Sequence, residues 1–319
     1  MKIIGILTSG GDAPGMNPAI RAVVRTALDN GLRVKGIRNG YDGVMKGDIY
    51  EMNVSSVADI IHKGGTILGT ARSLEFKELE GRKRGAQILR DYGIEGLIVI
   101  GGDGSFKGAK GLSDLGINTI AIPGTIDNDM NYTDYTIGFF TAVETVIDAI
   151  GKLRDTSSSH GRAVVIEVMG RHCGDIALYA GLAGGAESII VPEHEFSMQE
   201  IITKVERGKK RGKLHHLIAL AEGVGNPYEV ARELEDKTGV ETKVTVLGHV
   251  QRGGTPAAPD RLLGTTMGAR AVELLLEGKT NLAIGYSNGK LIEEAIDVAI
   301  EEKSKFNESL YTLANNLSQ

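Results

Sequence analysis

Two carboxylates follow a short apolar run in the middle of the chain. Residues 117–124 read INTIAIPG, and Asp127 and Asp129 come shortly afterwards, on either side of Asn128. One interpretation is a turn, because Asp and Asn side chains bond nearby backbone groups. The other is phosphoryl transfer, in which a carboxylate orients and deprotonates an attacking hydroxyl, while donors such as Thr125 surround the phosphoryl oxygens. The position at the end of a buried strand favours the second interpretation.

Glycine is enriched where such chemistry would need it. The chain has 44 glycines in 319 residues, about twice the usual share of ~7%. Clusters stand at the ends of three apolar runs, as Gly10-Gly11, Gly101–Gly104 and Gly124. Open parallel sheets bind ligands at the carboxyl ends of their strands, and a glycine loop that opens a helix offers free N–H groups to phosphate. One cluster could serve the backbone alone, but three together predict a phosphate site.

Asp103 lies inside the second cluster, GGDGS. It could be a helix N-cap, which is a common role of Asp. It could also bind Mg²⁺, which is typically held by one or two carboxylates plus phosphate oxygens. The flanking glycines would let a phosphate approach and favour the metal. The glycine runs match neither the G-x-x-x-x-G-K-S/T phosphate loop nor the G-x-G-x-x-G dinucleotide fingerprint.

Basic side chains also stand beside glycine at strand ends. Arg171 lies in RHCGD and Arg252 in QRGGT, where a bidentate guanidinium would suit a phosphate monoester. His249 could be a core or capping residue, or it could bond a sugar hydroxyl or phosphate. The run KVERGKKRGK at 204–213 is by default a solvated helix face.

Apolar runs alternate with helical patterns along the chain, which indicates strand–helix–strand units. The sequence therefore predicts the α/β class, with two Rossmann-like, three-layer α/β/α domains and mainly parallel sheets. No low-complexity linker separates them. The expected strands are 2–9, 32–40, 94–102, 117–124, 162–170, 187–193, 215–223 and 243–250. The expected helices include 17–31, one that ends with 85–93, 105–116, 141–159, 199–213, 228–239 and 261–278.

Composition excludes several classes of protein. The length of 319 residues suggests roughly two domains of ~150 residues. A net charge of -5 favours neither nucleic acid nor an anionic membrane as partner. The single cysteine, Cys173, permits no internal disulfide, and no apolar tract is long enough to cross a bilayer. We expect a cytoplasmic protein.

Many motifs occur together in one order: GILTSGGDAPGMN, GGDGS, PGTIDND, TIGF, RDTSSSH, EVMGR, AEGV and LGHVQRGG. From Lys2 to about Gly278 the chain closely resembles the bacterial ATP-dependent phosphofructokinases. The resemblance implies phosphorylation of fructose 6-phosphate by ATP, with Mg²⁺, to fructose 1,6-bisphosphate and ADP. It also implies a homotetramer with shared active sites, and ADP and phosphoenolpyruvate as effectors. The implied domains are 1–138 plus 251–301 for ATP, and 139–250 plus 302–319 for the sugar phosphate.

The resemblance also implies individual roles. Asp127 would be the base for the sugar 1-hydroxyl, Asp129 would help orient the metal region, and Asp103 would hold Mg²⁺. Thr125 and Arg171 would join Asp127 and Asp129 in catalysis. The implied ATP contacts are Gly11, Arg72, Ser73, Gly102, Asp103, Gly104 and Ser105. The implied substrate contacts are Thr125, Ile126, Asp127, Arg162, Met169, Gly170, Arg171, Glu222, Lys243, His249, Val250, Gln251 and Arg252, of which Arg162 and Lys243 would come from a neighbouring subunit. The implied effector residues are Arg21, Ala22, Val23, Val24, Arg25, Arg154, Gly185, Ala186, Glu187, Arg211, Lys213, Leu214 and His215.

Lys243 departs from the family pattern, which has Arg there. The charge is kept, but the bidentate fork is lost. Alternatives remain. Pyrophosphate-dependent relatives typically carry Asp at position 104 and Lys at position 124, where this chain has Gly104 and Gly124. The NAD kinases share GGDG but lack the later motifs. A non-catalytic nucleotide sensor would have lost Asp127.

Overall fold

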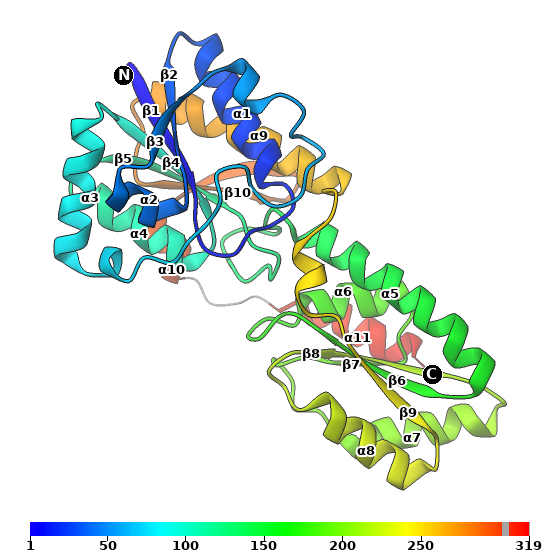
Figure 1. Cartoon of the computed structure of the whole chain (residues 1–319). Helices are drawn as coiled ribbons and strands as arrows, with labels where there is room; N and C mark the ends of the chain where they lie inside the picture. Colours follow the sequence, from blue (N-terminus) through cyan, green and yellow to red (C-terminus); the bar gives the residue numbers. More distant parts are fainter. Residues whose placement is uncertain (302–305, 319) are drawn as a thin grey trace. The chain divides into compact units, whose positions relative to one another are not determined.

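The computed structural model describes residues 1–301 and 306–318. The chain divides into two compact units (Figure 1). The first contains Met1–Ile126, Met130–Thr141 and the stretch from Arg252 to helix α10. The second contains Asp127–Asp129, Ala142–Gln251 and helix α11.

These bounds differ slightly from the expected ones. The chain passes between the units after Thr141 and after Gln251, whereas we expected crossings after residues 138 and 250. The short loop Asp127–Asp129 is grouped with the second unit, which the sequence did not indicate. The expected crossing after residue 301 borders positions 302–305, which lie outside the described residues.

The first unit contains a seven-stranded sheet in the order β11-β10-β5-β4-β1-β2-β3. Its central pairs are parallel, as predicted from their apolar runs. The edges differ, because β3 and β11 are antiparallel to their neighbours. The strands are β1 (Ile3–Thr8), β2 (Arg33–Ile37), β3 (Ile49–Met52), β4 (Gly96–Gly101), β5 (Asn118–Pro123), β10 (Leu282–Ser287) and β11 (Lys290–Ala295).

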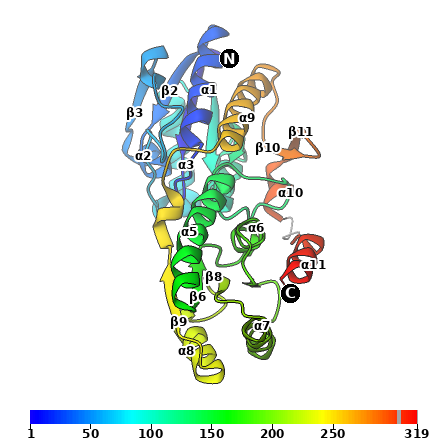
Figure 2. The same cartoon turned by 90° about the vertical axis from the view of Figure 1, so that its right-hand side faces the viewer.

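Helices cover both faces of this sheet, which gives the predicted three layers (Figures 1 and 2). Helices α1 and α9 pack against each other on one face. A Cβ at Gly264 would lie 2.6 Å from the Gly15 carbonyl oxygen, so glycine permits this close approach. The helices are α1 (Met16–Asp29) and α9 (Ala258–Leu276) on this face, and α2 (Gly40–Lys46), α3 (Leu79–Asp91), α4 (Asp103–Ser113) and α10 (Ile296–Glu301) on the other.

The second unit is built around a parallel sheet in the order β7-β8-β6-β9. Helices again cover both faces. The strands are β6 (Ala163–Val168), β7 (Ser188–Ile190), β8 (His216–Ala221) and β9 (Thr242–Val246). The helices are α7 (Met198–Lys210) and α8 (Pro227–Thr238) on one face, and α5 (Phe139–His160), α6 (Asp175–Gly184) and α11 (Glu308–Leu317) on the other.

The expected strand 243–250 is too long. β9 ends at Val246, and Gly248–Arg252 forms a 3-10 turn, η3. Gly248 has φ +52, a left-handed conformation that interrupts an extended chain and suits glycine. Among the described helices, none combines the length and apolarity needed to cross a bilayer.

Candidate active site

The three glycine clusters meet at one edge of the seven-stranded sheet. They follow the neighbouring strands β1, β4 and β5. The Ser9 amide donates to the Ile100 carbonyl at 2.9 Å, and the Gly124 amide donates to the Gly101 carbonyl at 3.0 Å. A Cβ at Gly101 would lie 2.3 Å from the Ser9 carbonyl oxygen. Glycine is therefore required for these loops to pack together.

Helix α4 begins at this edge. Its N-cap is Gly102, so Asp103 is not the cap. The Asp103 carboxylate is partly exposed and pairs with Lys107 at 2.7 Å. Ser105 Oγ is buried, and no hydrogen-bond partner for it occurs in the part of the chain that the structure describes. A Cβ at Gly104 would meet nothing within 4 Å. The helix start thus combines open space, an unpartnered hydroxyl and a carboxylate.

These residues fit a metal–nucleotide complex. Mg²⁺ usually takes only one or two protein carboxylates, with phosphate oxygens and water as its other ligands. Asp103 supplies one carboxylate at a helix N-terminus, where the positive end of the dipole favours phosphate. No cluster of three or more His, Cys, Asp or Glu side chains that could hold a metal occurs among the described residues. A site completed by nucleotide phosphates needs none.

Arg252 lies against the first glycine loop. A Cβ at Gly11 would be only 2.3 Å from a guanidinium nitrogen of Arg252, and that nitrogen donates to the Asp12 carbonyl at 3.5 Å. The structure therefore places an implied substrate residue beside an implied nucleotide residue. Arg72 is exposed, and Ser73 Oγ accepts a hydrogen bond from the Phe76 amide at 3.3 Å.

The loop with the two carboxylates continues from β5. Thr125 is held by a hydrogen bond from Thr136 Oγ1 to its carbonyl at 2.7 Å. Asp127 is partly buried and Asp129 is exposed. Between them Asn128 has φ +54, and its Nδ2 donates to Asp175 Oδ2 at 2.8 Å. Asn128 therefore has a left-handed backbone conformation typical of turns, and its side chain reaches helix α6.

The carboxyl end of the four-stranded sheet gathers several implied substrate residues. Met169 and Gly170 follow β6, and Glu222 follows β8, with its amide donating to the Val168 carbonyl at 2.8 Å. Gly170 has φ +118, and a Cβ there would lie 2.3 Å from the Cys173 carbonyl oxygen. The tight turn thus requires glycine and brings the exposed Arg171 to the same edge.

Burial separates these implied residues into two groups. His249 and Val250 are exposed in η3 and can meet a ligand. Gln251 is fully buried, and its Oε1 accepts from the Met169 amide at 3.2 Å. The side chain of Ile126 is also fully buried. Gln251 and Ile126 can therefore support the site, but their side chains do not present a surface to substrate.

Arg162 and Lys243 lie at the opposite end of the same sheet. Arg162 immediately precedes β6, and Lys243 pairs with Val164 in the ladder of β6 and β9. Their cationic groups contact one carboxylate: Arg162 Nε is 2.5 Å and Lys243 Nζ 2.8 Å from oxygens of Glu241. These hydrogen bonds hold the pKa of Glu241 well below its ordinary value. A six-residue strand spans about 20 Å, so this pair is far from Met169.

A second anionic residue organises the implied effector residues of this unit. Glu187 is buried, and its carboxylate contacts Lys213 Nζ at 2.5 Å and the Leu217 amide at 2.6 Å. His215 Nε2 lies 3.7 Å from the same group. Arg154 donates to the Gly185 carbonyl at 3.0 Å. Arg211 and Leu214 are exposed nearby in the chain, and Ala186 is buried.

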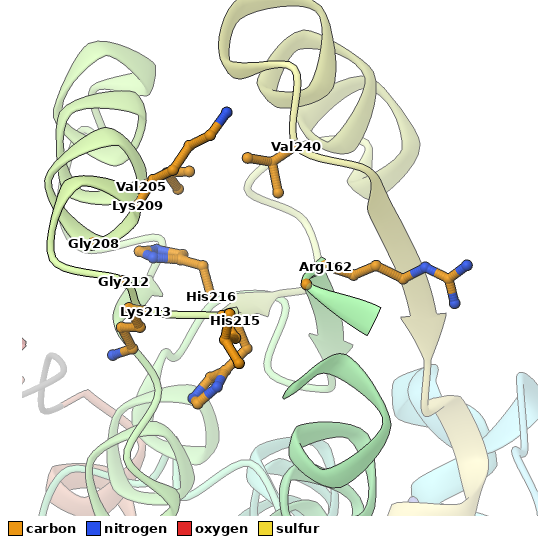
Figure 3. A pocket seen from close by; sticks show the side chains of 11 residues that line it. Arg162, Val205, Gly208, Lys209, Gly212, Lys213, His215, His216 and Val240 are labelled. Atoms are coloured by element: carbon orange, nitrogen blue, oxygen red, sulfur yellow. The ribbon is translucent and has the colours of Figure 1, made fainter. Parts of the chain in front are cut away.

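A pocket of about 230 Å³ opens beside Lys213 and His215 (Figure 3). Arg162 also borders it, but its guanidinium points away from the hollow. At its wall stands His216, whose Nε2 lies 3.1 Å from Ser188 Oγ. Burial lowers the pKa of His216 to about 4, so this ring is neutral at physiological pH. The pocket is lined by Gly161, Arg162, Val205, Gly208, Lys209, Gly212, Lys213, Leu214, His215, His216 and Val240.

The remaining implied effector residues lie on helix α1 of the first unit. Ala22, Val23 and Val24 are buried in the core. Arg21 is partly exposed and Arg25 is exposed. Of these five implied residues, only the two arginines therefore present side chains to solvent.

Sequence reasoning missed two residues that organise these sites. Asp175 binds Asn128, and Glu241 joins Arg162 to Lys243. Asp175 stands inside RHCGD, which drew attention only for its arginine. Glu241 stands two residues before Lys243. In both cases an acidic residue beside a recognised motif was the available signal.

Comparison with known proteins gives a consistent result. The family model described as Phosphofructokinase matches residues 3–275. A curated protein of Finegoldia magna, named ATP-dependent 6-phosphofructokinase, is 68% identical over 318 residues, which covers 100% of both chains. One of Clostridium tetani with the same name is 62% identical, again over 100% of both. A solved phosphofructokinase of Saccharomyces cerevisiae is 37% identical with a TM-score of 0.87, and the match covers 100% of this chain and 47% of the yeast chain. The chain belongs to the phosphofructokinase family.

Proposed function

We propose that this protein is an ATP-dependent 6-phosphofructokinase, which transfers the γ-phosphoryl group of ATP to the 1-hydroxyl of fructose 6-phosphate. The proposal rests on the glycine edge, by which we mean the carboxyl ends of β1, β4 and β5 with the glycine clusters that follow them. There, open space at Gly104 and the start of α4 adjoin β5, the strand that leads to Asp127. Full-length relatives with this printed name support it.

Each group has a defined task in this reaction. The N-terminus of α4 and Ser105 bind nucleotide phosphates, and Asp103 would hold Mg²⁺, which would neutralise phosphate charge when bound. Asp127 accepts the proton of the 1-hydroxyl as the attack on phosphorus begins. Thr125 and Arg171 stabilise the transferred group, and Asp129 orients the metal region. The first unit is the nucleotide domain, and the second is the sugar-phosphate domain.

Subunits share the active site in this proposal. Met169 and Glu222 lie at one end of the four-stranded sheet and the Arg162–Lys243 pair at the other. One subunit cannot bring both ends of a strand to one sugar phosphate. The pair therefore serves the site of a neighbouring subunit, in a homotetramer. We call Glu187, Lys213 and Arg154 the Glu187 cluster. In this proposal the cluster binds ADP or phosphoenolpyruvate as effector.

The test is a donor comparison with purified protein and fructose 6-phosphate. We expect ATP to give fructose 1,6-bisphosphate and ADP in equal amounts, and pyrophosphate to give no product. Product from pyrophosphate with release of inorganic phosphate would assign the protein to the pyrophosphate-dependent branch instead. Absence of product with either donor would overturn the proposed function.

A further inference from the structure

Asn128 joins the proposed catalytic loop to the start of helix α6. Its Nδ2 donates to Asp175 Oδ2 at 2.8 Å, and Sγ of Cys173 lies 3.8 Å from its backbone carbonyl oxygen. We propose that Asp175 is a positioning residue for phosphoryl transfer, because its hydrogen bond to Asn128 fixes the place of Asp127. This inference rests on the function proposed above, since it requires Asp127 to act as the base.

The backbone at Asn128 explains why an anchor matters. Its φ of +54 is left-handed, a region that Asn tolerates better than most residues but that is still unfavourable for a side chain with a Cβ. Around a left-handed residue the two neighbouring side chains leave the chain in directions that an extended segment would not give. A displacement of about 1 Å in a reacting group can cost roughly 10²-fold in rate. The bond to Asp175 therefore acts at a place where a small displacement of the Asp127 carboxylate would slow the reaction strongly.

The other end of the bond is rigid. Asp175 is the first residue of α6 and only 9% exposed. The preceding Gly174 donates its amide to Glu193 Oε1 at 2.8 Å. Cys173 is 2% exposed and lies in the tight turn that begins at the left-handed Gly170. Helix α6 thus provides a fixed base, and Asn128 is held by both its side chain and its backbone carbonyl.

A purely structural role explains Asp175 less well. The N-cap of α6 is Gly174, with no side-chain capping bond. No cation pairs with Asp175 among the residues that the structure describes, and the titratable groups that act on it are Cys173 and Glu193. Burial raises the pKa of Asp175 to about 6, the hydrogen bond from Asn128 opposes this shift, and the Glu193 carboxylate adds to it. The side-chain partner that the structure gives Asp175 is Asn128, in the proposed catalytic loop.

The kinetic test uses the full-length protein with four variants: Asp175→Ala, Asp175→Asn, Asn128→Ala and the double Ala variant. We expect each single Ala substitution to lower kcat roughly 10- to 100-fold, with the KM for ATP within about twofold. Asp175→Asn keeps an acceptor oxygen and should restore kcat to within about threefold. The double variant should be no slower than the worse single variant, because both changes break one bond. Glu229→Ala, which removes an exposed first-turn acid from α8, is the matched control and should leave kcat unchanged.

Other outcomes would overturn the inference. Wild-type kcat in Asp175→Ala would show that the anchor is unnecessary. Multiplicative losses in the double variant would show that the two residues act separately. A folded Asp175→Asn as slow as Asp175→Ala would show that the charge, not the hydrogen bond, is what matters.

A second readout needs no turnover. Cys173 is the sole cysteine of the sequence, and its buried thiol reports loosening of the loop above it. Asn128→Ala should raise its rate of modification by a thiol-specific reagent about tenfold or more, since reactivity follows exposure. An unchanged rate would overturn the anchoring. Lack of turnover by the wild-type protein would overturn the proposed function, and with it the role of Asp175 in phosphoryl transfer. Normal wild-type turnover with an unaffected Asp175→Ala would overturn this inference alone.

Discussion

Glu241 holds the two cations that we assign to the sugar phosphate. Arg162 and Lys243 contact its two oxygens, and solvent screens these exposed ion pairs, so each contributes little to stability. A phosphate dianion can therefore compete with this carboxylate. In the structure Glu241 keeps the two cations side by side.

Lys243 should limit the affinity for fructose 6-phosphate. A guanidinium at this position would add two parallel hydrogen bonds in a fixed fork, whereas an ammonium is a single mobile charge. Lys243→Arg should lower the KM for fructose 6-phosphate about fivefold, equivalent to roughly 1 kcal/mol, and leave kcat and ATP affinity unchanged. Lys243→Ala should raise that KM, because the charge is lost as well. Steady-state kinetics checks both variants.

The exposed Lys237 in the last turn of α8 offers a matched control. Lys237→Ala removes the same charge from the same unit and should leave the KM unchanged. If neither Lys243 variant differs from this control, Lys243 lies outside the sugar-phosphate site.

Asp175 should make stability depend on pH. Its pKa is raised from 3.8 to about 6 by burial, so the folded state holds a proton that the unfolded state releases. The stabilisation that this proton gives the folded state is fully present below about pH 4 and is lost as the pH rises through about 6. Asp175→Asn cannot ionise. Relative to the wild type, the free energy of unfolding of Asp175→Asn should increase between pH 4 and pH 7.5, by up to about 3 kcal/mol at ~1.36 kcal/mol per pKa unit. Melting temperatures at the two pH values test this, and a constant difference would contradict it.

At the scale of elements, the sequence predicted the buried strands but not the partly polar strands at the edges of the first sheet. Strand β4 is apolar throughout, β8 is apolar after His216, and both are buried at every position, so their patterns were clear. Strands β3 and β11 carry exposed or partly exposed polar residues and lie at the edges of the sheet. Such strands need only one partner and show weaker patterns. The expected strand at 243–250 was too long because a left-handed Gly248 is not visible in an apolar pattern.

The residues of the candidate site were likewise predictable from the sequence only in part. Glycine clusters and carboxylates were found because strand ends of a parallel sheet share an edge. The bond between Asn128 and Asp175 joins residues 47 positions apart, and no local pattern encodes it. Gln251 was expected to contact substrate because it lies in LGHVQRGG, whereas the structure shows its side chain fully buried.

The start of α4 should decide the phosphate donor. Gly104 faces open space, so Gly104→Asp should fold normally but place a carboxylate where the nucleotide phosphates bind. We expect the KM for ATP to rise at least about tenfold, because one repulsive contact of roughly 1.4 kcal/mol suffices. Gly151→Asp is the matched control, since Gly151 is also a helical glycine with open space beside it. Equal ATP kinetics in both folded variants would show that α4 does not approach the nucleotide.

At the scale of the whole molecule, the proposal requires communication between distinct anion sites. The Glu187 cluster shares no residue with the glycine edge of the first unit. Effects of an anion bound there must therefore pass through the packed elements of the subunit or through subunit contacts.

Loss of cations from this cluster should weaken regulation without weakening catalysis. Arg154→Ala and Lys213→Ala should reduce the response to phosphoenolpyruvate and ADP, while kcat without effector stays within about twofold, because coupling is typically only ~1–3 kcal/mol. Lys210→Ala, at an exposed position of α7, is the control. Titration of activity with each effector is the measurement. If the parent enzyme responds to neither effector, the cluster has no regulatory role.

The most direct test of the account is phosphoryl transfer by Asp127→Ser. A single-turnover experiment with ATP and fructose 6-phosphate measures the chemical step, with Asp114→Ser, at an exposed acid after α4, as control. We predict that Asp127→Ser slows this step roughly 10²–10⁴-fold, equivalent to about 3–5 kcal/mol at ~1.36 kcal/mol per tenfold, while ATP binding stays unchanged. A near-normal rate in folded Asp127→Ser would contradict the account and make Asp129 the candidate base.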